Sequence, residues 1–212
     1  MTLSEKAKRV LDILEKEYPN PKIALNFKTP LELLIATILS AQCTDERVNK
    51  TTPALFKKYK KTKDYAETDL KELEGSISSI NFFRNKAKNI QACCKKIANE
   101  FGGEIPDTLE RLITLPGIGR KTANIVLSSV FGKDAIAVDT HVKRVSNRIG
   151  LASSDNPDKI EEELCKIIIR KRWTKATNLL IHHGRYICVA KKPKCEICKI
   201  KDYCNYFKSP CA

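Results

Sequence analysis

Apolar residues recur at spacings of three and four along most of the chain, which is the pattern of one buried helical face. These runs predict helices near residues 7–14, 31–39, 90–97, 109–113, 122–131, 142–149, 164–169 and 179–187. Residues 135–138 form a compact apolar run that could pass for a strand, but it is too short and isolated to found a sheet. The pattern therefore predicts an all-α protein.

Proline and glycine mark several ends of these helices. Pro30 suits the first turn of one helix, Gly132 stops another, and Gly150 is a candidate C-cap. No internal repeat, low-complexity tract or obvious linker divides the chain. Charge and motif position favour one helical lobe over residues 21–132 and a second lobe in the remaining C-terminal half.

The charge of the chain points to a polyanionic partner. Lysine and arginine number 39 against 25 acidic residues, giving a formal net charge of +14. Each phosphate neutralised by such a surface releases counterions, which drives binding without regard to sequence. Charge alone does not separate DNA, RNA and anionic lipid.

The sequence shows no sign of a membrane segment or a targeting peptide. No apolar run reaches the roughly 18–20 residues that span a bilayer, and no signal or transit peptide is evident. We therefore expect no membrane partner and a cytoplasmic location.

The most informative segment is Leu-Pro-Gly-Ile-Gly-Arg-Lys-Thr-Ala-Asn at residues 115–124, which favours nucleic acid. A Pro-Gly-x-Gly turn between apolar helical runs predicts a helix–hairpin–helix motif over about residues 107–131. Gly117 and Gly119 would let a phosphate approach backbone N–H groups closely. Lys121 then falls in the first turn of the next helix, where the positive end of the dipole disfavours an ammonium and so favours a nucleophilic amine.

A carboxylate follows eighteen residues after Lys121, at Asp139 in Val-Asp-Thr-His. An amine and a nearby carboxylate are a plausible pair for Schiff-base chemistry on a sugar carbon. Taken singly, the same features could be an ordinary turn, a surface lysine and a helix N-cap. Their order in one chain favours the catalytic interpretation, with the two residues on opposite sides of a cleft between the lobes.

Four of the nine cysteines cluster near the C-terminus with the spacing C-x6-C-x2-C-x5-C, at Cys188, Cys195, Cys198 and Cys204. Zinc sites usually combine two close cysteine pairs, whereas a [4Fe–4S] cube tolerates wider loops. The spacing favours the [4Fe–4S] cluster over zinc or unrelated thiols. The remaining cysteines have no metal-like spacing and are interpreted as core or incidental residues: Cys43, Cys93, Cys94, Cys165 and Cys211.

The wide loop inside this cluster carries Lys191, Lys192 and Lys194 around Pro193. A basic loop held at its metal-bound ends is a candidate phosphate contact; the alternative is a solvated run of charge.

Several separated motifs, taken together, resemble the endonuclease III family of helix–hairpin–helix DNA glycosylases: ELLIATILSAQCTDERVNK, INFFRNKAKNI, LPGIGRKTAN, AVDTHVKR, and HGRYIC with the cysteine tail. The resemblance implies an all-α, two-lobed fold. Its barrel-like domain would span residues 21–132, and residues 1–20 would join residues 133–212 in the cluster domain. It also implies excision of oxidised pyrimidines from double-stranded DNA, cleavage at the abasic site, and a monomer associated with a prokaryotic nucleoid.

The resemblance also assigns roles residue by residue. Lys121 matches the nucleophile that attacks C1′, and Asp139 matches the carboxylate that helps to activate it. Gln42 matches the residue that fills the gap left by a flipped nucleotide. The remaining expected DNA contacts are the wedge loop Ile80, Asn81 and Phe82, the hairpin residues Gly117, Gly119 and Arg120, together with His141, and the basic-loop lysines.

The sequence departs from the family pattern at a few positions. Cys43 stands where alanine is usual, and Asn81-Phe82-Phe83 replaces Gly-Leu-Tyr, which puts opposite-base preference in question. His182 and His183 are interpreted as structural neighbours of the cluster. A monofunctional mismatch glycosylase would lack Lys121, and a non-catalytic DNA-binding module would not need Asp139.

Overall fold

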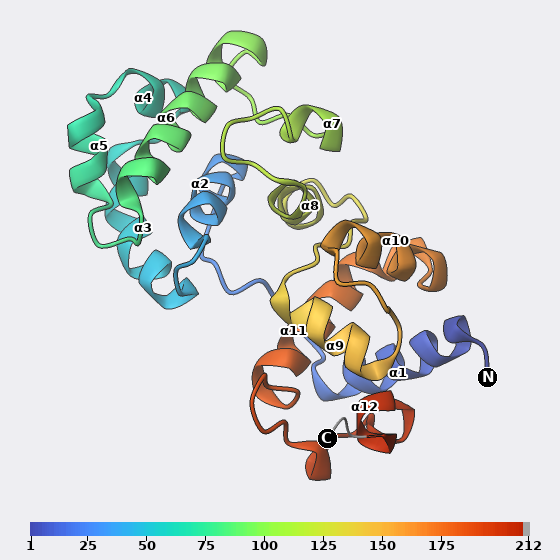
Figure 1. Cartoon of the computed structure of the whole chain (residues 1–212). Helices are drawn as coiled ribbons and strands as arrows, with labels where there is room; N and C mark the ends of the chain where they lie inside the picture. The colour runs from blue at the N-terminus through green and yellow to red at the C-terminus, as the bar shows by residue number, and fades with distance from the viewer. Residues whose placement is uncertain (210–212) are drawn as a thin grey trace. The chain divides into compact units, whose positions relative to one another are not determined.

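The computed structural model describes residues 1–209, in which every regular element is helical (Figure 1). This confirms the all-α prediction. Contacts divide the chain into two units, Ala24–Gly132 and a second unit of Met1–Ile23 together with the chain from Lys133 onward. Residues 21–23, assigned to the barrel-like lobe from the sequence, group with the second unit. Cys211 lies outside the described residues.

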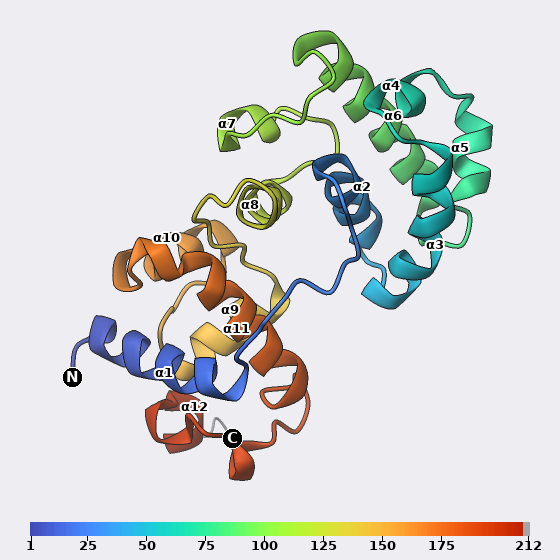
Figure 2. The same cartoon turned by 180° about the vertical axis from the view of Figure 1, so that it is seen from behind.

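The first unit is organised around one helix that is buried on nearly all sides. In α2 the residues from Leu33 to Leu39 are all buried, which makes it a central core helix. It contacts α3, α6 and α8 (Figure 1; seen from behind in Figure 2). The helices of this unit are α2 (Pro30–Ser40), α3 (Asp45–Lys58), α4 (Thr62–Glu67), α5 (Leu70–Ser76), α6 (Phe83–Glu100), α7 (Leu109–Leu112) and α8 (Arg120–Ser129).

The second unit combines the N-terminal helix with the C-terminal part of the chain. Helix α11 contacts both α1 and α9, and α10 contacts α1. Its helices are α1 (Leu3–Glu17), α9 (Thr140–Ile149), α10 (Pro157–Ile167), α11 (Trp173–Tyr186) and α12 (Asn205–Lys208), with 3-10 turns at Arg170–Arg172, Cys195–Ile197 and Lys201–Tyr203.

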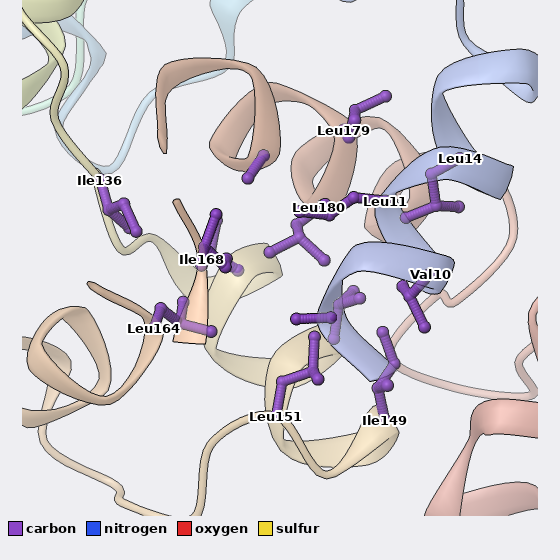
Figure 3. Close-up of a cluster of buried hydrophobic side chains, with 14 of the residues drawn as sticks. Val10, Leu11, Leu14, Ile136, Ile149, Leu151, Leu164, Ile168, Leu179 and Leu180 are labelled. Carbon is purple, nitrogen blue, oxygen red and sulfur yellow. The ribbon is translucent and has the colours of Figure 1, made fainter. Parts of the chain in front are cut away.

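The apolar faces predicted from periodicity form the core of the second unit. Val10, Leu11 and Leu14 of α1 meet Leu179 and Leu180 of α11 in one buried cluster (Figure 3). Removing such side chains from water is the main stabilising contribution of the unit. The cluster continues through Ile136, Val138, Val142, Val145, Ile149, Leu151, Ile160, Leu164, Ile168 and Ile200.

Local capping explains where the outer helices of this unit begin and end. Thr2 and Glu5 form a reciprocal capping box at the start of α1. Gly150 ends α9 in the left-handed region, at φ +84°, as its position in the sequence predicted.

Residues 135–138 are buried but take part in no strand. Among residues 1–209, none of the helices is both long and apolar enough to cross a membrane.

Candidate functional site

The loop between α7 and α8 forms a tightly anchored hairpin. Leu115 and Ile118 are buried and fix the loop to the core of the first unit. Gly117 has a φ of +79°, and a Cβ at this position would lie 3.0 Å from the Cβ of Asn89 on α6. Both the backbone conformation and the close approach to α6 therefore require glycine here.

The second glycine of the hairpin has a different role. Gly119 is the N-cap of α8 and, having no side chain, makes no side-chain capping hydrogen bond to the helix. A Cβ at Gly119 would meet nothing within 4 Å, so a side chain there would extend into open space in front of the helix. The N–H groups and the dipole of a helix N-terminus attract anions. The hairpin can therefore receive a phosphate, with the exposed side chains of Arg120 and Lys121 beside it.

Lys121 and Asp139 each lie at the N-terminal end of a helix. Lys121 lies in the first turn of α8 and is exposed. Asp139 is the N-cap of α9, and its Oδ1 accepts a hydrogen bond of 2.7 Å from the N–H of Val142. The second carboxylate oxygen of Asp139 has no such role in the cap. The structure thus shows Asp139 as a helix N-cap that uses one of its two carboxylate oxygens.

His141 is fixed against α11 in the second unit. A Cβ on Gly184 would lie 2.9 Å from the Cβ of His141, so the helices touch closely at this point. Nη2 of Arg144 lies 3.1 Å from Nδ1 of the His141 ring. These contacts hold the half-buried ring in one orientation, two residues after Asp139 in the chain.

The loop after α2 and the loop before α6 are joined by hydrogen bonds. Nδ2 of Asn81 donates to the main-chain oxygen of Gln42 over 2.9 Å. Nη1 of Arg47, on α3, donates to Oδ1 of Asn81 over 3.1 Å. Two of the predicted DNA contacts, Gln42 and Asn81, are therefore joined directly by a hydrogen bond.

The predicted wedge, residues 80–82, presents one large apolar side chain. Phe82 is 62 % exposed, whereas Ile80 is only 2 % exposed and belongs to the core. The structure corrects the sequence interpretation of Ile80 as a side chain that contacts DNA: the alternation of buried and exposed positions in this turn directs it inward. Phe82 is the large apolar side chain that this turn exposes.

Backbone strain is concentrated at the predicted DNA contacts. Among residues 1–209, the non-glycine residues with positive φ are Gln42, Phe82 and Lys192, at 53°, 56° and 54°. This left-handed conformation costs an ordinary residue about 1–2 kcal/mol. Strain of this kind persists where surrounding contacts enforce it, and it gathers at functional sites.

The four clustered cysteines line one pocket of the second unit. Cys188, Cys195, Cys198 and Cys204 share its wall with His183, whose Nε2 lies 3.6 Å from Sγ of Cys198. The remaining wall is mainly apolar and includes Ile149, Ile187, Pro193, Ile200, Tyr206 and Phe207. The sequence motif is thus brought together in space.

The four thiols that line the pocket are the donor set of a [4Fe–4S] cluster, which is held by cysteine thiolates. Four thiolates can also hold a structural zinc ion, at about 2.3 Å from a single point. In the described residues, no group of three or more His, Cys, Asp or Glu side chains forms such a single-ion site.

Burial and mutual proximity disfavour the thiolate forms of two cysteines in the pocket. Burial raises the pKa of the Cys198 thiol, with a further increase from the neighbouring Cys204. Burial and the neighbouring Cys188 thiol raise the pKa of Cys195 in the same way. Bound iron would compensate this penalty, because a metal ligates the thiolate form. The backbone N–H of Ile200 already stabilises the thiolate of Cys198.

The basic loop is tied to α9 by one arginine. Arg148 donates hydrogen bonds to the carbonyls of Val189 and Ala190 over 2.8 and 3.0 Å. Its Nη1 also lies 3.5 Å from Sγ of Cys188. These contacts fix the start of the loop, in which Lys192 takes its positive φ. The side chains of Lys191, Lys192 and Lys194 remain exposed.

Sequence reasoning missed Arg148 and Arg47, which hold the candidate sites in place. Arg148 belongs to none of the motifs, and Arg47 lies inside one of them without a predicted role. Arg144 and Arg148 are four residues apart and follow Asp139 on one helix. Nε of Arg144 donates to the carbonyl of Cys188 over 3.0 Å. For Arg148 the available signal was the spacing of two arginines on α9. For Arg47 it was only a place inside a motif, with no indication of its role.

Comparisons with known proteins agree with these features. Residues 35–170 match the HhH-GPD superfamily of base excision DNA repair proteins, and residues 188–204 match the iron–sulfur binding domain of endonuclease III. Endonuclease III of Synechocystis sp. is 51 % identical over 94 % of this chain and 92 % of its own length. The Escherichia coli (strain K12) protein is 42 % identical over 95 % and 96 %.

A solved structure of similar fold is a trapped endonuclease III–DNA covalent intermediate. It superposes with a TM-score of 0.93 at 44 % identity and covers 98 % of both chains. The enzyme is thus a DNA N-glycosylase and abasic-site lyase of base excision repair, and Cys188–Cys204 is its [4Fe–4S] segment. With its hairpin, its cysteine pocket and relatives matched almost end to end, the chain belongs to the endonuclease III family of the helix–hairpin–helix superfamily.

Proposed function

We propose that the chain removes oxidised pyrimidines, such as thymine glycol, from double-stranded DNA through an imine at Lys121 and then cleaves the abasic site. The main support for this proposal is the exposed amine of Lys121 in the first turn of α8, directly after a hairpin suited to a phosphate. A relative with 44 % identity has been trapped in a covalent intermediate with DNA. Such a bond needs a nucleophile, and Lys121 supplies one.

The proposed reaction starts at C1′ of the damaged nucleoside. The lone pair of the Lys121 amine forms a bond to C1′ while the bond from C1′ to the base breaks, and the base leaves with that electron pair. The carboxylate of Asp139 accepts a proton from the attacking nitrogen and stabilises positive charge that develops on the sugar. Opening of the sugar ring then gives an imine between Lys121 and C1′.

Strand cleavage follows from the electronics of the imine. Because the imine accepts electrons, a proton can leave C2′, and the C2′ electron pair then expels the 3′ phosphate from C3′. Water hydrolyses the imine and restores the amine. In this scheme the hairpin holds the DNA backbone. Cys188 and Cys195, two of the residues that would hold the [4Fe–4S] cluster, lie at the two ends of the basic loop.

Exposed residues outside the hairpin support duplex binding. Gln42 and Phe82 occupy neighbouring loops in strained conformations and suit insertion into the stack. An inserted side chain costs a few kcal/mol of unstacking, which is least at a damaged pair and so adds selectivity. Lys192 and its neighbours provide phosphate contacts, in keeping with the net charge of +14.

Borohydride trapping tests the assignment directly. Lys121→Gln is expected to abolish both the trapped adduct and base excision, while its affinity for duplex DNA stays near that of the parent. Lys63→Gln, a change at an exposed lysine of α4, controls for the lost charge. Duplexes with thymine glycol, 8-oxoguanine, uracil, a mismatch or an abasic site define the substrate class. Efficient trapping by Lys121→Gln, or preference for the mismatch, would overturn the proposal.

The protein would act as a monomer on chromosomal DNA in the cytoplasm of a prokaryote. One chain contains the hairpin, the candidate base-filling residue and the cysteine pocket. Sedimentation at the mass of one chain, with and without a duplex, checks this.

A further inference from the structure

Lys86 is a buried lysine that no part of the proposed reaction uses. It lies on α6 and is 6 % exposed. Within residues 1–209, no other lysine, arginine, aspartate or glutamate falls in the buried class. Burial lowers the pKa of Lys86, because an ammonium loses its hydration there. A charge held in the core against this cost needs an explanation.

The ammonium of Lys86 binds the end of the central helix. Its Nζ donates to the carbonyl of Leu39 over 2.7 Å and to that of Ala41 over 2.6 Å. Helix α2 ends at Ser40, so these carbonyls belong to the group that has no intrahelical partner. The last turn of α2 contains no basic residue of its own. Lys86 therefore supplies both the hydrogen bonds and the positive charge that a helix C-terminus favours.

The chain leaves α2 directly into the strained residue Gln42. The Ala41 carbonyl, which belongs to the peptide that links Ala41 to Gln42, is held by Lys86. The carbonyl of Gln42 itself is held by Asn81 over 2.9 Å. Contacts on both sides of Gln42 thus enforce its φ of 53°.

The same lysine is also connected to the second strained residue. The backbone N–H of Lys86 donates to the carbonyl of Phe82 over 3.1 Å, closing the first turn of α6. Phe82 has a φ of 56°, and its side chain is exposed. Lys86 therefore links two backbone segments: its side chain holds the residue before Gln42, and its main chain holds Phe82.

We propose that Lys86 is a positioning residue for duplex insertion, which fixes the backbone at Gln42 and at Phe82 without touching DNA. The proposal rests on the proposed function, because it assumes that these two residues enter the DNA stack. It differs from a general stabilising role in one respect. Loss of Lys86 should impair work on a duplex, where a gap must be opened and filled, more than work on a single strand, where no partner strand is displaced.

The test measures borohydride trapping at one abasic site in duplex and in single-stranded DNA, with each variant divided by the parent on the same strand. Lys86→Met keeps the stem and removes the charge. Lys86→Arg keeps the charge and the donors. Lys95→Met removes a charge from an exposed position on the same helix. Gln42→Ala is the reference for a protein that cannot fill the gap. A 2-aminopurine base next to the lesion reports unstacking by fluorescence.

Lys86→Met is expected to lose at least about tenfold on the duplex and to stay within about twofold on the single strand, since a displacement of about 1 Å can cost about 100-fold. The 2-aminopurine signal should fall in parallel. Lys86→Arg should recover part of the duplex rate, and Lys95→Met should match the parent on both strands.

Equal losses on both strands, or no loss on the duplex, would overturn the role of Lys86. If Lys86→Met does not fold, Lys86→Gln replaces it, and failure of both to fold would assign Lys86 to stability alone and also overturn the proposal. If Gln42→Ala shows no duplex-specific loss, the insertion role of Gln42, on which the positioning role of Lys86 depends, is rejected. A loss for Gln42→Ala without one for Lys86→Met rejects only the positioning role of Lys86.

Discussion

The side-chain amide of Asn81 donates to the main-chain carbonyl of Gln42 over 2.9 Å. This hydrogen bond joins the loop after α2 to the loop before α6. Because it uses the main chain of Gln42, it leaves the side chain of Gln42 exposed. An exposed side chain on a fixed backbone is what insertion into a duplex requires, since little conformational freedom is lost on binding.

Gln42→Ala should therefore lower excision from a thymine glycol duplex more than it lowers affinity for the same DNA. The side chain acts on the flipped state and not on the first encounter, which depends on phosphates. Single-turnover excision and fluorescence anisotropy measure the two quantities. An equal decrease in both would mean that Gln42 is an ordinary binding contact.

Phe82 should show a conflict between stability and activity. Its left-handed backbone is strained, and its exposed ring contributes little to the core. Phe82→Gly removes the strain, whereas Phe82→Ala keeps a Cβ at the same φ. We expect the glycine variant to be more stable than the alanine variant by up to about 1 kcal/mol, as judged by denaturant unfolding.

Both Phe82 variants should lose the unstacking signal of 2-aminopurine, because neither carries a ring to insert. A glycine variant that is less stable than the alanine variant would show that the positive φ is not a source of strain. Retained unstacking in both would remove Phe82 from the wedge.

Sequence periodicity predicted the helices whose apolar stripe is uninterrupted and missed those whose stripe is not. The run from Leu31 to Leu39 predicted α2. Helix α3 was missed because its buried face is only Val48, Thr52 and Leu55, with a threonine in the stripe and Pro53 inside the helix. Proline removes a backbone donor and usually ends a helix, so the sequence around Pro53 did not indicate a helix. In the structure the helix nevertheless continues through Pro53.

The candidate site divides in the same way. Residues within a contiguous motif, such as Gly117 and Lys121, could be located from spacing alone. Ile80 was misassigned because a motif match does not report which side chains of a turn are buried. Lys86 and Arg148 were missed because their partners are backbone carbonyls, which leave no trace in the sequence.

Asp139 offers a way to separate capping from catalysis. Asp139→Asn should keep a side-chain oxygen for the N–H of Val142, and so change thermal stability little. It removes the charge, and excision and trapping should fall by orders of magnitude. Asp139→Ala removes both functions and should also cost about 0.5–2 kcal/mol of stability. Active but unstable Asp139→Asn protein would leave the residue with a capping role only.

The cysteine pocket predicts a brown protein with about four irons per chain and a broad visible absorption band. Cys195→Ala should lower iron content and solubility, because folding of the C-terminal segment is coupled to the metal. Cys43→Ala, which changes a cysteine outside the pocket, is the matched control and should retain full iron content. Anaerobically prepared protein that is colourless and contains one zinc per chain would contradict the assignment.

The basic loop should contribute affinity without selectivity. Lys191 and Lys192 are exposed, and Arg148 fixes the backbone from which they extend. If both lysines bind phosphates, changing both to alanine should weaken binding to damaged and undamaged duplexes by the same factor. The slope of log K against log salt should become shallower by about 0.9 for each phosphate that is no longer neutralised.

The control for the loop variant is Lys57→Ala/Lys58→Ala, which removes the same charge from the last turn of α3. General electrostatic attraction would respond equally to the two double variants, whereas a phosphate site at the loop responds only to its own. An unchanged salt slope in the loop variant would return Lys191 and Lys192 to the solvated surface. A loss confined to damaged DNA would instead mean that the loop senses the deformation of the duplex.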